Sequence, residues 1–311
     1  MRGVTALAVA LTATPVAADD HDPANDVAET IARAAPHADR VMTTTAIPVT
    51  DAEYDLGDVE VSVPLDADKP LLIEAGGTGT EISLPAELRV RDGVLADDGT
   101  VVFEEAGDGA HAAVQALDDG SVRLQTVLDS PDAPSTYTYD FGQGVELVLL
   151  ENGSVEVTEP LGDGIVAVTG TIDAPWAIDA DGASVPTSYT VDGSRLVQHV
   201  EHGPQHTYPI TADPSYSYGW KVYTKYSRSE TRNIAGWTSY GTIVSGVCPF
   251  IPRFGQVTAA ACIAAFSAVA TSIDNTFNSA KSQGRCVEIS YPYYPTLVTI
   301  AAQARWKVVS C

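Results

Sequence analysis

The sequence predicts an α+β protein. An antiparallel β-rich domain, a sandwich or a meander, would precede a small disulfide-closed domain made of a helical hairpin and β-strands. Asp-Gly and Asn-Gly turn pairs recur at roughly ten-residue spacing before residue 200, and all four cysteines follow residue 247. The charge also changes sign. Residues 19–213 hold 38 acidic and 7 basic side chains (net −31), whereas residues 214–311 hold 3 acidic and 9 basic ones (net +6). Such asymmetry is typical of separate modules with different partners.

The first residues have the pattern of a secretory signal peptide. Arg2 gives a positive start, Val4 to Thr14 are apolar or small, and Val16-Ala17-Ala18 fits a cleavage site. The stretch is too short to span a bilayer, and the alternative is a buried N-terminal helix. We therefore expect cleavage after Ala18, removal of residues 1–18 and an extracellular protein.

Residues 19–50 are expected to form a helical or disordered leader. Asp26 is placed to cap a helix over Val27 to Ala35, and Pro36 would stop it. Because the apolar stripe of this helix is thin, the sequence does not decide whether the helix docks on the next domain.

Residues 51–213 are predicted to form the acidic antiparallel β domain. The clearest hairpin joins Val145–Leu150 to Ser154–Thr158, and further alternating strands cover Ser121–Leu128 and Ser188–Val200. Asp-Gly and Asn-Gly suit tight turns because these need positive φ angles. The pairs begin at Asp92, Asp98, Asp108, Asp119, Asn152, Asp163, Asp181 and Asp192.

Gly203–Tyr218 is interpreted as a connector because it contains three prolines, although Tyr208–Thr211 could still add a last strand. The domain boundary is placed near Asp213. Residues 214–311 would then form the basic four-cysteine α+β module. Its first strand is expected over Trp220–Tyr226.

A capping box at Ser227 and Glu230 predicts the start of the first helix of the module, which would run to about residue 247. A second helix is expected from about residue 254 to 281, with Gly284 as its stop. Strands over Cys286–Tyr291 and Arg305–Val309 would close the chain.

Four cysteines in an exported chain predict two disulfides, for which three pairings exist. Cys248–Cys262 would clip the helical hairpin. Cys286 and Cys311 lie opposite each other if the last two strands pair antiparallel about Val298, so we prefer these two pairs.

No catalytic motif, cofactor motif or metal motif is complete, so we expect no catalytic residue and no cofactor. His199, His202 and His206 are the only clustered histidines, and a polar strand end explains them better than a metal site. Asp179 and Asp181 resemble the start of a calcium loop, but the later ligands of that motif are missing. A hydrolase that no motif marks remains an alternative.

The basic side chains of the last module are candidates for contact with the cell envelope, although they could instead face the acidic domain. The uncharged run from Val257 to Ser272 fits a buried helix better than a membrane span, because 16 residues are few and Ala and Thr are weakly hydrophobic. The candidate basic residues are Lys221, Lys225, Arg228, Arg232, Lys281, Arg285, Arg305 and Lys307.

Residues 170–311 resemble a region of uncharacterised secreted actinobacterial proteins. The shared stretches are IDAPWAIDADGASVPTSYTVDGSRLVQHVEH, YPITADPSY, SETRNIA, a Cys before Pro, an Ala-Cys in the second helix and Gly-Arg-Cys. The resemblance implies export and paired cysteines. It implies no activity, because that family has no assigned function.

The leading hypothesis is a secreted, non-enzymatic protein. Its acidic β domain would carry, as a carrier or pro-domain, a basic disulfide-closed module that binds the envelope or an anionic membrane in a bacteriocin-like manner. Contact between the acidic and basic domains is expected, and the net charge of −24 argues against nucleic acid as a partner. The alternative is a cell-surface structural or binding protein that works through its β domain.

Overall fold

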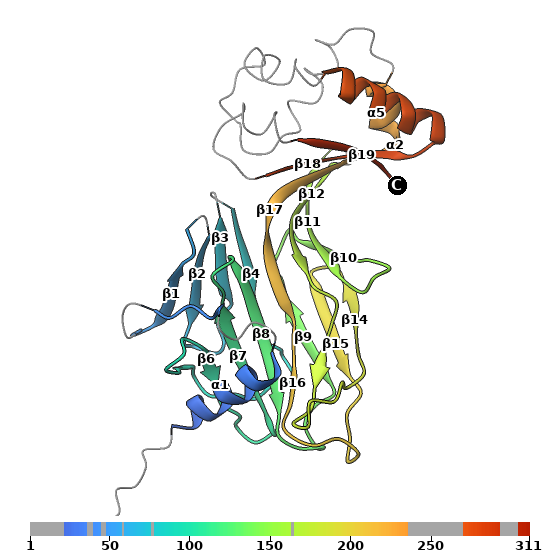
Figure 1. Cartoon of the computed structure of the whole chain (residues 1–311). Helices are drawn as coiled ribbons and strands as arrows, with labels where there is room; N and C mark the ends of the chain where they lie inside the picture. The colour runs from blue at the N-terminus through green and yellow to red at the C-terminus, as the bar shows by residue number, and fades with distance from the viewer. Residues whose placement is uncertain are drawn as a thin grey trace, which may run out of the picture.

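The computed structural model describes residues 22–35, 40–44, 48–57, 59–75, 78–162, 165–235, 270–292 and 304–311. Figure 1 shows a large β-rich body beneath a smaller head, in which two helices lie over strands. The elements are α1 (Pro23–Ala34), β1 (Asp51–Asp55), β2 (Val59–Pro64), β3 (Leu71–Ala75), β4 (Thr78–Ile82), β5 (Val94–Leu95), β6 (Val101–Phe103), β7 (Ala110–Ala116), β8 (Ser121–Leu128), β9 (Thr136–Asp140), β10 (Glu146–Leu149), β11 (Val155–Gly162), β12 (Ile165–Ile172), β13 (Ala177–Ile178), β14 (Thr187–Asp192), β15 (Arg195–Val200), β16 (Ile210–Ala212), β17 (Ser215–Tyr226), α2 (Arg228–Ile234), α5 (Ala270–Gln283), β18 (Cys286–Pro292) and β19 (Arg305–Val309).

The strands form three antiparallel sheets, which confirms the antiparallel β-rich prediction. One sheet has the order β1-β2-β3-β4, and a small one has the order β14-β15-β9. The large sheet has twelve strands, with β10-β11-β12-β17-β8-β7-β6-β5 as its main path. A single apolar cluster contains residues from all three sheets, among them Ile73, Leu124 and Leu196, each at most 1% exposed. The three sheets of the body therefore share one core.

Turns are present at most of the Asp-Gly and Asn-Gly pairs. In several of them, however, the glycine closes a four-residue turn and is not a central residue, as where the Gly120 N–H donates to the Leu117 carbonyl at 3.0 Å. Six of these glycines have positive φ angles, Gly93 does not, and the pair at 163–164 lies outside the described residues. At Gly99 the φ angle is +93°, and a Cβ would stand 2.2 Å from the Met42 carbonyl oxygen. Glycine is required there by both backbone conformation and space.

The leader contains helix α1, and this helix is docked on the body. Asp22 caps it, with the Ala24 N–H donating to its side chain at 3.1 Å. The predicted cap at Asp26 is therefore wrong, because Pro23 already supplies the fixed φ angle that suits a first helical turn. Four buried residues of α1 pack on the large sheet and on the turn after β5. Ala24, Val27, Ala28 and Ile31 share one apolar cluster with Val102, Ala113 and Val127 of the sheet and with Ala96 of the turn.

Strand β17 belongs to both the body and the head. Its start pairs with β8 (Ser215 opposite Arg123), and its end pairs with β18 (Tyr226 opposite Val287). Strand β12 follows the opposite edge of β17 over both stretches. The prediction of a connector is therefore wrong for residues 215–218, which are strand, and for residues 210–212, where β16 overlaps the alternative last strand over Tyr208–Thr211.

The head is built on the second half of β17. Here α5 packs on β18 and β19, and Phe277 of α5 contacts the rings of Tyr226 and Trp306 at 5.2 and 6.0 Å between centroids. The capping box at Ser227 and the helix stop at Gly284 (φ +65°) are both present, as the sequence predicts.

One of the two preferred disulfides is seen. Cys286 and Cys311 are bonded, with their Cα atoms 5.1 Å apart, and β18 pairs antiparallel with β19 as predicted. Cys248 and Cys262 lie outside the described residues, as do the rest of the first predicted helix and residues 254–269 of the second. The predicted membrane alternative over Val257–Ser272 falls mostly on the same undescribed stretch.

Candidate functional site: a basic patch on the head

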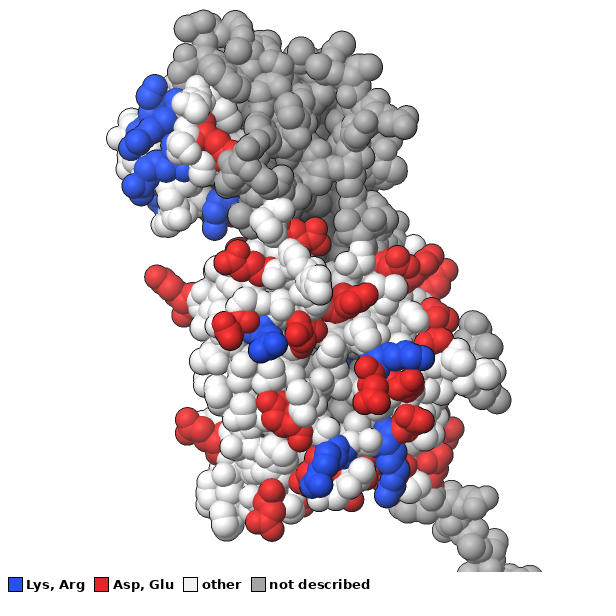
Figure 2. Space-filling view, turned by 180° about the vertical axis from the view of Figure 1, so that it is seen from behind, with Lys and Arg blue, Asp and Glu red and all other residues white. Residues whose placement is uncertain are grey.

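Four of the predicted cations meet at one end of the head. The pairing of Tyr226 with Val287 brings the start of α2 beside the end of α5. Arg228 and Arg232 stand one helical turn apart on α2, and Lys281 and Arg285 flank the α5 stop. All four are exposed, and Lys and Arg gather on this side of the head in Figure 2. We call Arg228, Arg232, Lys281 and Arg285 the basic patch.

The patch cations are not committed to acids of the described chain. Within the described residues, none of the four has an ion pair within 4 Å or a side-chain hydrogen bond. The nearest acid in sequence, Glu230, accepts from the backbone N–H of Ser227 at 2.8 Å and from its hydroxyl at 2.6 Å. Four positive charges are therefore presented to solvent side by side.

Two other predicted cations lie on the sheet of the head, on either side of an acidic residue. Glu288 on β18 stands opposite Lys225 of β17 and opposite Lys307 of β19. Partial burial and the nearby carboxylate of Glu156 raise the pKa of Glu288, and the two lysines act against this rise. Lys225 and Lys307 therefore partly compensate the negative charge of a half-buried carboxylate.

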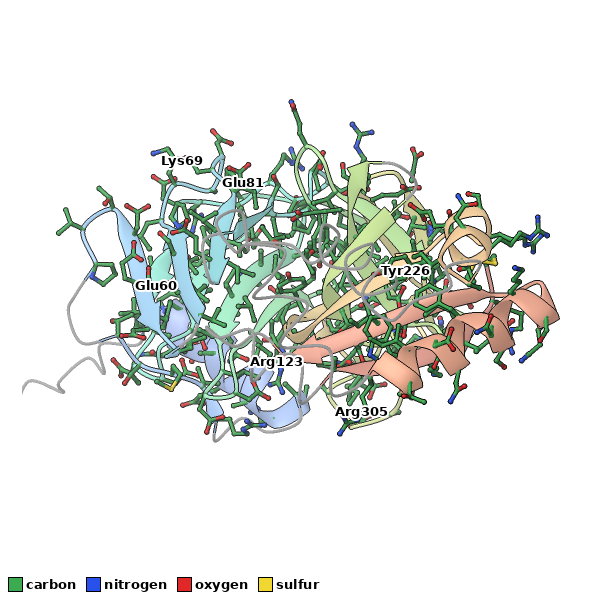
Figure 3. The ribbon with its side chains drawn as sticks, turned by 90° about the horizontal axis from the view of Figure 1, so that it is seen from above. Glu60, Lys69, Glu81, Arg123, Tyr226 and Arg305 are labelled. Atoms are coloured by element: carbon green, nitrogen blue, oxygen red, sulfur yellow. A yellow bond between two sulfur atoms is a disulfide. The ribbon has the colours of Figure 1, made fainter. Side chains whose placement is uncertain are left out.

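The remaining two cations lie apart from the patch. Arg305 lies on β19 opposite Ser290 at the outer edge of the head (Figure 3). Lys221 lies on β17, and its side chain is outside the description. Of the eight predicted residues, four therefore form the basic patch, two stand opposite Glu288, and two lie at separate positions on β17 and β19.

The three clustered histidines do not converge. The His199 ring lies between Thr136 and Thr190, at 3.4 and 3.2 Å. The His202 ring contacts the Tyr208 hydroxyl at 2.8 Å, and His206 lies 3.8 Å from Asp179. In the described part of the chain no three His, Cys, Asp or Glu side chains are grouped to hold a metal ion.

Asp179 holds a turn through its carboxylate. Its Oδ1 accepts from the backbone N–H groups of Asp181 and Ala183 at 3.1 and 2.8 Å. The Ala183 N–H is the main cause that lowers the pKa of Asp179. Asp181 accepts from the Thr207 hydroxyl at 2.6 Å.

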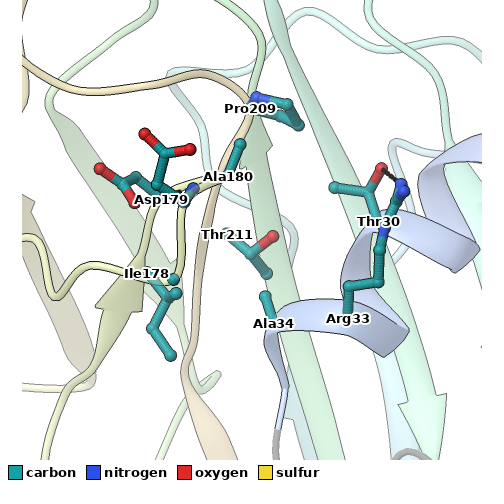
Figure 4. A pocket seen from close by; sticks show the side chains of 10 residues that line it. Thr30, Arg33, Ala34, Ile178, Asp179, Ala180, Pro209 and Thr211 are labelled. Atoms are coloured by element: carbon teal, nitrogen blue, oxygen red, sulfur yellow. Dashed lines mark hydrogen bonds between the residues drawn. The ribbon is translucent and has the colours of Figure 1, made fainter.

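A cavity of about 420 Å³ separates this turn from helix α1 (Figure 4). Arg33 stands on the helix side, where it donates to Thr30 at 3.1 Å, and Pro209 and Thr211 line the cavity between helix and turn. The charged groups around the cavity are largely engaged with their own neighbours.

His111, which contacts a carboxylate in the body, has no free ring nitrogen. His111 Nε2 lies 2.7 Å from Asp129, and its Nδ1 accepts the Glu105 N–H at 3.1 Å. Both ring nitrogens are used, so this histidine is not placed to take a proton from a substrate.

Asp213 is a residue whose environment the sequence does not indicate. It is 0% exposed, and its Oδ1 accepts from the Trp176 N–H at 2.9 Å and from Gln198 at 3.2 Å. Burial raises the pKa of Asp213 to about 7. Only the pairing of β16 and β17 with β8, distant in sequence, places this carboxyl inside the body.

Comparisons with known proteins add no family. No family model matches the chain, and no curated protein does. Among the helices that the structure describes, none has the length and apolar character needed to cross a bilayer.

Proposed function

We propose that the protein is exported and attaches an acidic β body to an anionic polymer of the cell envelope through its basic head. The basic patch is the observation that carries this proposal, because four uncommitted cations lie together on a chain of net charge −24. Carboxylates are spread over the body below the head in Figure 2. An anionic surface would repel the body and attract the head, so the protein would bind in one orientation.

The head is proposed to act while attached to the body. Its first strand, β17, continues the sheet of the body, and Asp213 and Ala212 are both 0% exposed. Release of a basic effector by a cut near residue 213 would require the body to open first. A permanent carrier therefore fits better than a cleaved pro-domain.

The rest of the head is proposed to be the predicted helical hairpin, closed by a Cys248–Cys262 disulfide. Removal of residues 1–18 and secretion belong to the same proposal. Mass spectrometry of the exported protein tests these steps: the expected product starts at Asp19 and carries two disulfides.

Binding of the full mature chain to isolated cell walls at low salt tests the patch. We expect Arg228→Gln, Arg232→Gln, Lys281→Gln and Arg285→Gln together to weaken binding on the order of 30-fold, at ~0.5 kcal/mol for each exposed contact. Raising the salt concentration should also weaken binding of the wild-type protein to cell walls, because salt screens exposed charges.

The matched control removes four cations from the body: Arg33→Gln, Arg89→Gln, Arg91→Gln and Arg195→Gln, with the same change in net charge. Equal loss in both variants would show that only total charge matters and would refute a specific patch. Absence of wild-type binding at low salt, or binding to anionic lipid vesicles alone, would refute an envelope polymer as the target.

A further inference from the structure

An open groove lies on the head between helix α5 and edge strand β19. Its volume is about 620 Å³, and only described residues line it. Strand β19 pairs with β18 alone among the described strands, and three of its residues line the groove. The helix side is lined by Thr271, Ser272, Asn275, Thr276 and Ser279, and the strand side by Trp306, Lys307 and Val308.

The helical wall carries hydrogen-bonding groups and no charge. Thr271, Asn275 and Ser279 recur every fourth residue and so follow one side of the helix over ~12 Å. Thr276 donates to the Ser272 carbonyl at 2.8 Å, and Ser279 accepts from Gln283 at 2.8 Å. Within the described chain, the hydroxyls of Thr271 and Ser272 and the amide of Asn275 have no hydrogen-bond partner.

The strand wall carries an aromatic ring. Trp306 is half-buried, and its contact with Phe277 at 6.0 Å fixes the ring against the helix. Lys307 lies opposite Glu288 on the neighbouring strand and so has an acid near it already. The groove is therefore lined by one aromatic residue, two hydroxyls without a partner among the described residues and an amide, and its helical wall carries no charged side chain.

This combination suits a sugar chain. A sugar ring has an apolar face that can lie on an indole, and its hydroxyls both donate and accept hydrogen bonds, as Ser, Thr and Asn side chains do. A phosphate or carboxylate ligand would need a cation on the helical wall, and an apolar ligand would leave the amide and hydroxyls unpaired.

We propose that the groove between α5 and β19 binds an uncharged stretch of a glycan chain. This deepens the proposed function, on which it rests, by naming the envelope polymer as a glycan. The basic patch would then bind acidic substituents elsewhere on the same glycan, and the groove would contact its sugar rings.

The test uses the full mature chain and three neutral tetrasaccharides: β-1,4-linked N-acetylglucosamine, β-1,4-linked glucose and α-1,6-linked mannose. Calorimetry is expected to detect binding of at least one, unchanged within about twofold between 0.05 and 0.5 M NaCl because no ion pair is involved. Thr271→Ala with Asn275→Ala should weaken it at least ~10-fold, through two lost hydrogen bonds.

Asn278→Ala is the matched control, since Asn278 is exposed on the same helix outside the groove. Its affinity should stay within about twofold of wild type, and circular dichroism should show that both variants fold. Equal weakening by the control would overturn the proposal.

The two proposals fail separately. If none of the tetrasaccharides binds while the wild type still sediments with cell walls, the groove proposal falls and the patch proposal stands. If a tetrasaccharide binds but the patch variant sediments with walls as well as wild type does, the groove proposal stands and the patch proposal falls.

Discussion

At the scale of single residues, the buried carboxyl of Asp213 couples stability to pH. Its carboxyl is inside the body, and burial raises its pKa from the ordinary 3.8 to about 7. The folded state therefore keeps a proton that the unfolded chain releases between these pH values. The stabilising effect is complete below pH ~4 and is lost as the pH rises through 7.

We predict that Asp213→Asn makes the protein more stable than wild type at pH 8.5 and changes it little near pH 4.5. The upper bound on this gain in unfolding free energy is on the order of 4 kcal/mol, because the pKa of Asp213 is raised by about three and each step of one in pKa corresponds to 1.36 kcal/mol. Urea unfolding at both pH values measures this difference. Asp181→Asn, at an exposed position, is the control. A variant that keeps the wild-type pH dependence would contradict the assignment to Asp213.

At the scale of elements, local patterns predict local structure well. The Ser227 capping box, the Gly284 stop and most Asx-Gly turns are present because each depends on a few adjacent residues. The start of β17 was not predicted, because Pro214 and its neighbours favour a connector, whereas pairing with β8 and β12 makes residues 215–218 a strand.

The Cys286–Cys311 disulfide holds the last strand in place, and its removal should loosen the head. We predict that Cys286→Ser with Cys311→Ser lowers stability by ~3 kcal/mol, since the bridge closes a loop with a sequence separation of 25 residues. Hydrogen exchange should rise first in β18 and β19 and stay near wild type in β7 and β8. Uniformly faster exchange throughout the body would contradict a local role.

In the candidate site, too, some features could be predicted from the sequence and others depended on the fold. All four patch residues were among the predicted cations, because charge is visible in the sequence. Their separation from Lys225 and Lys307 depends on strand pairing with Glu288 and could not be predicted. The groove between α5 and β19 was not predicted either, because Ser, Thr and Asn along one side of a helix indicate a site only once a strand is known to lie beside them.

At the scale of the whole molecule, the shared strand makes the head and body hard to separate. We predict that Asp-N protease does not cut the native chain before Asp213, because Ala212 and Asp213 are 0% exposed and β16 is hydrogen-bonded on both sides. Peptide mapping should find that cut only after urea is added. Native cleavage at this bond, with release of an intact basic fragment, would restore the pro-domain hypothesis.

A protein held at a surface by its head has to transmit any pull on its body through the backbone of β17. The load would run lengthwise along the ladder that joins β17 to β12, so several hydrogen bonds would be sheared together instead of opening one after another. Such an attachment would keep the body in a more fixed orientation to the surface than a flexible tether would.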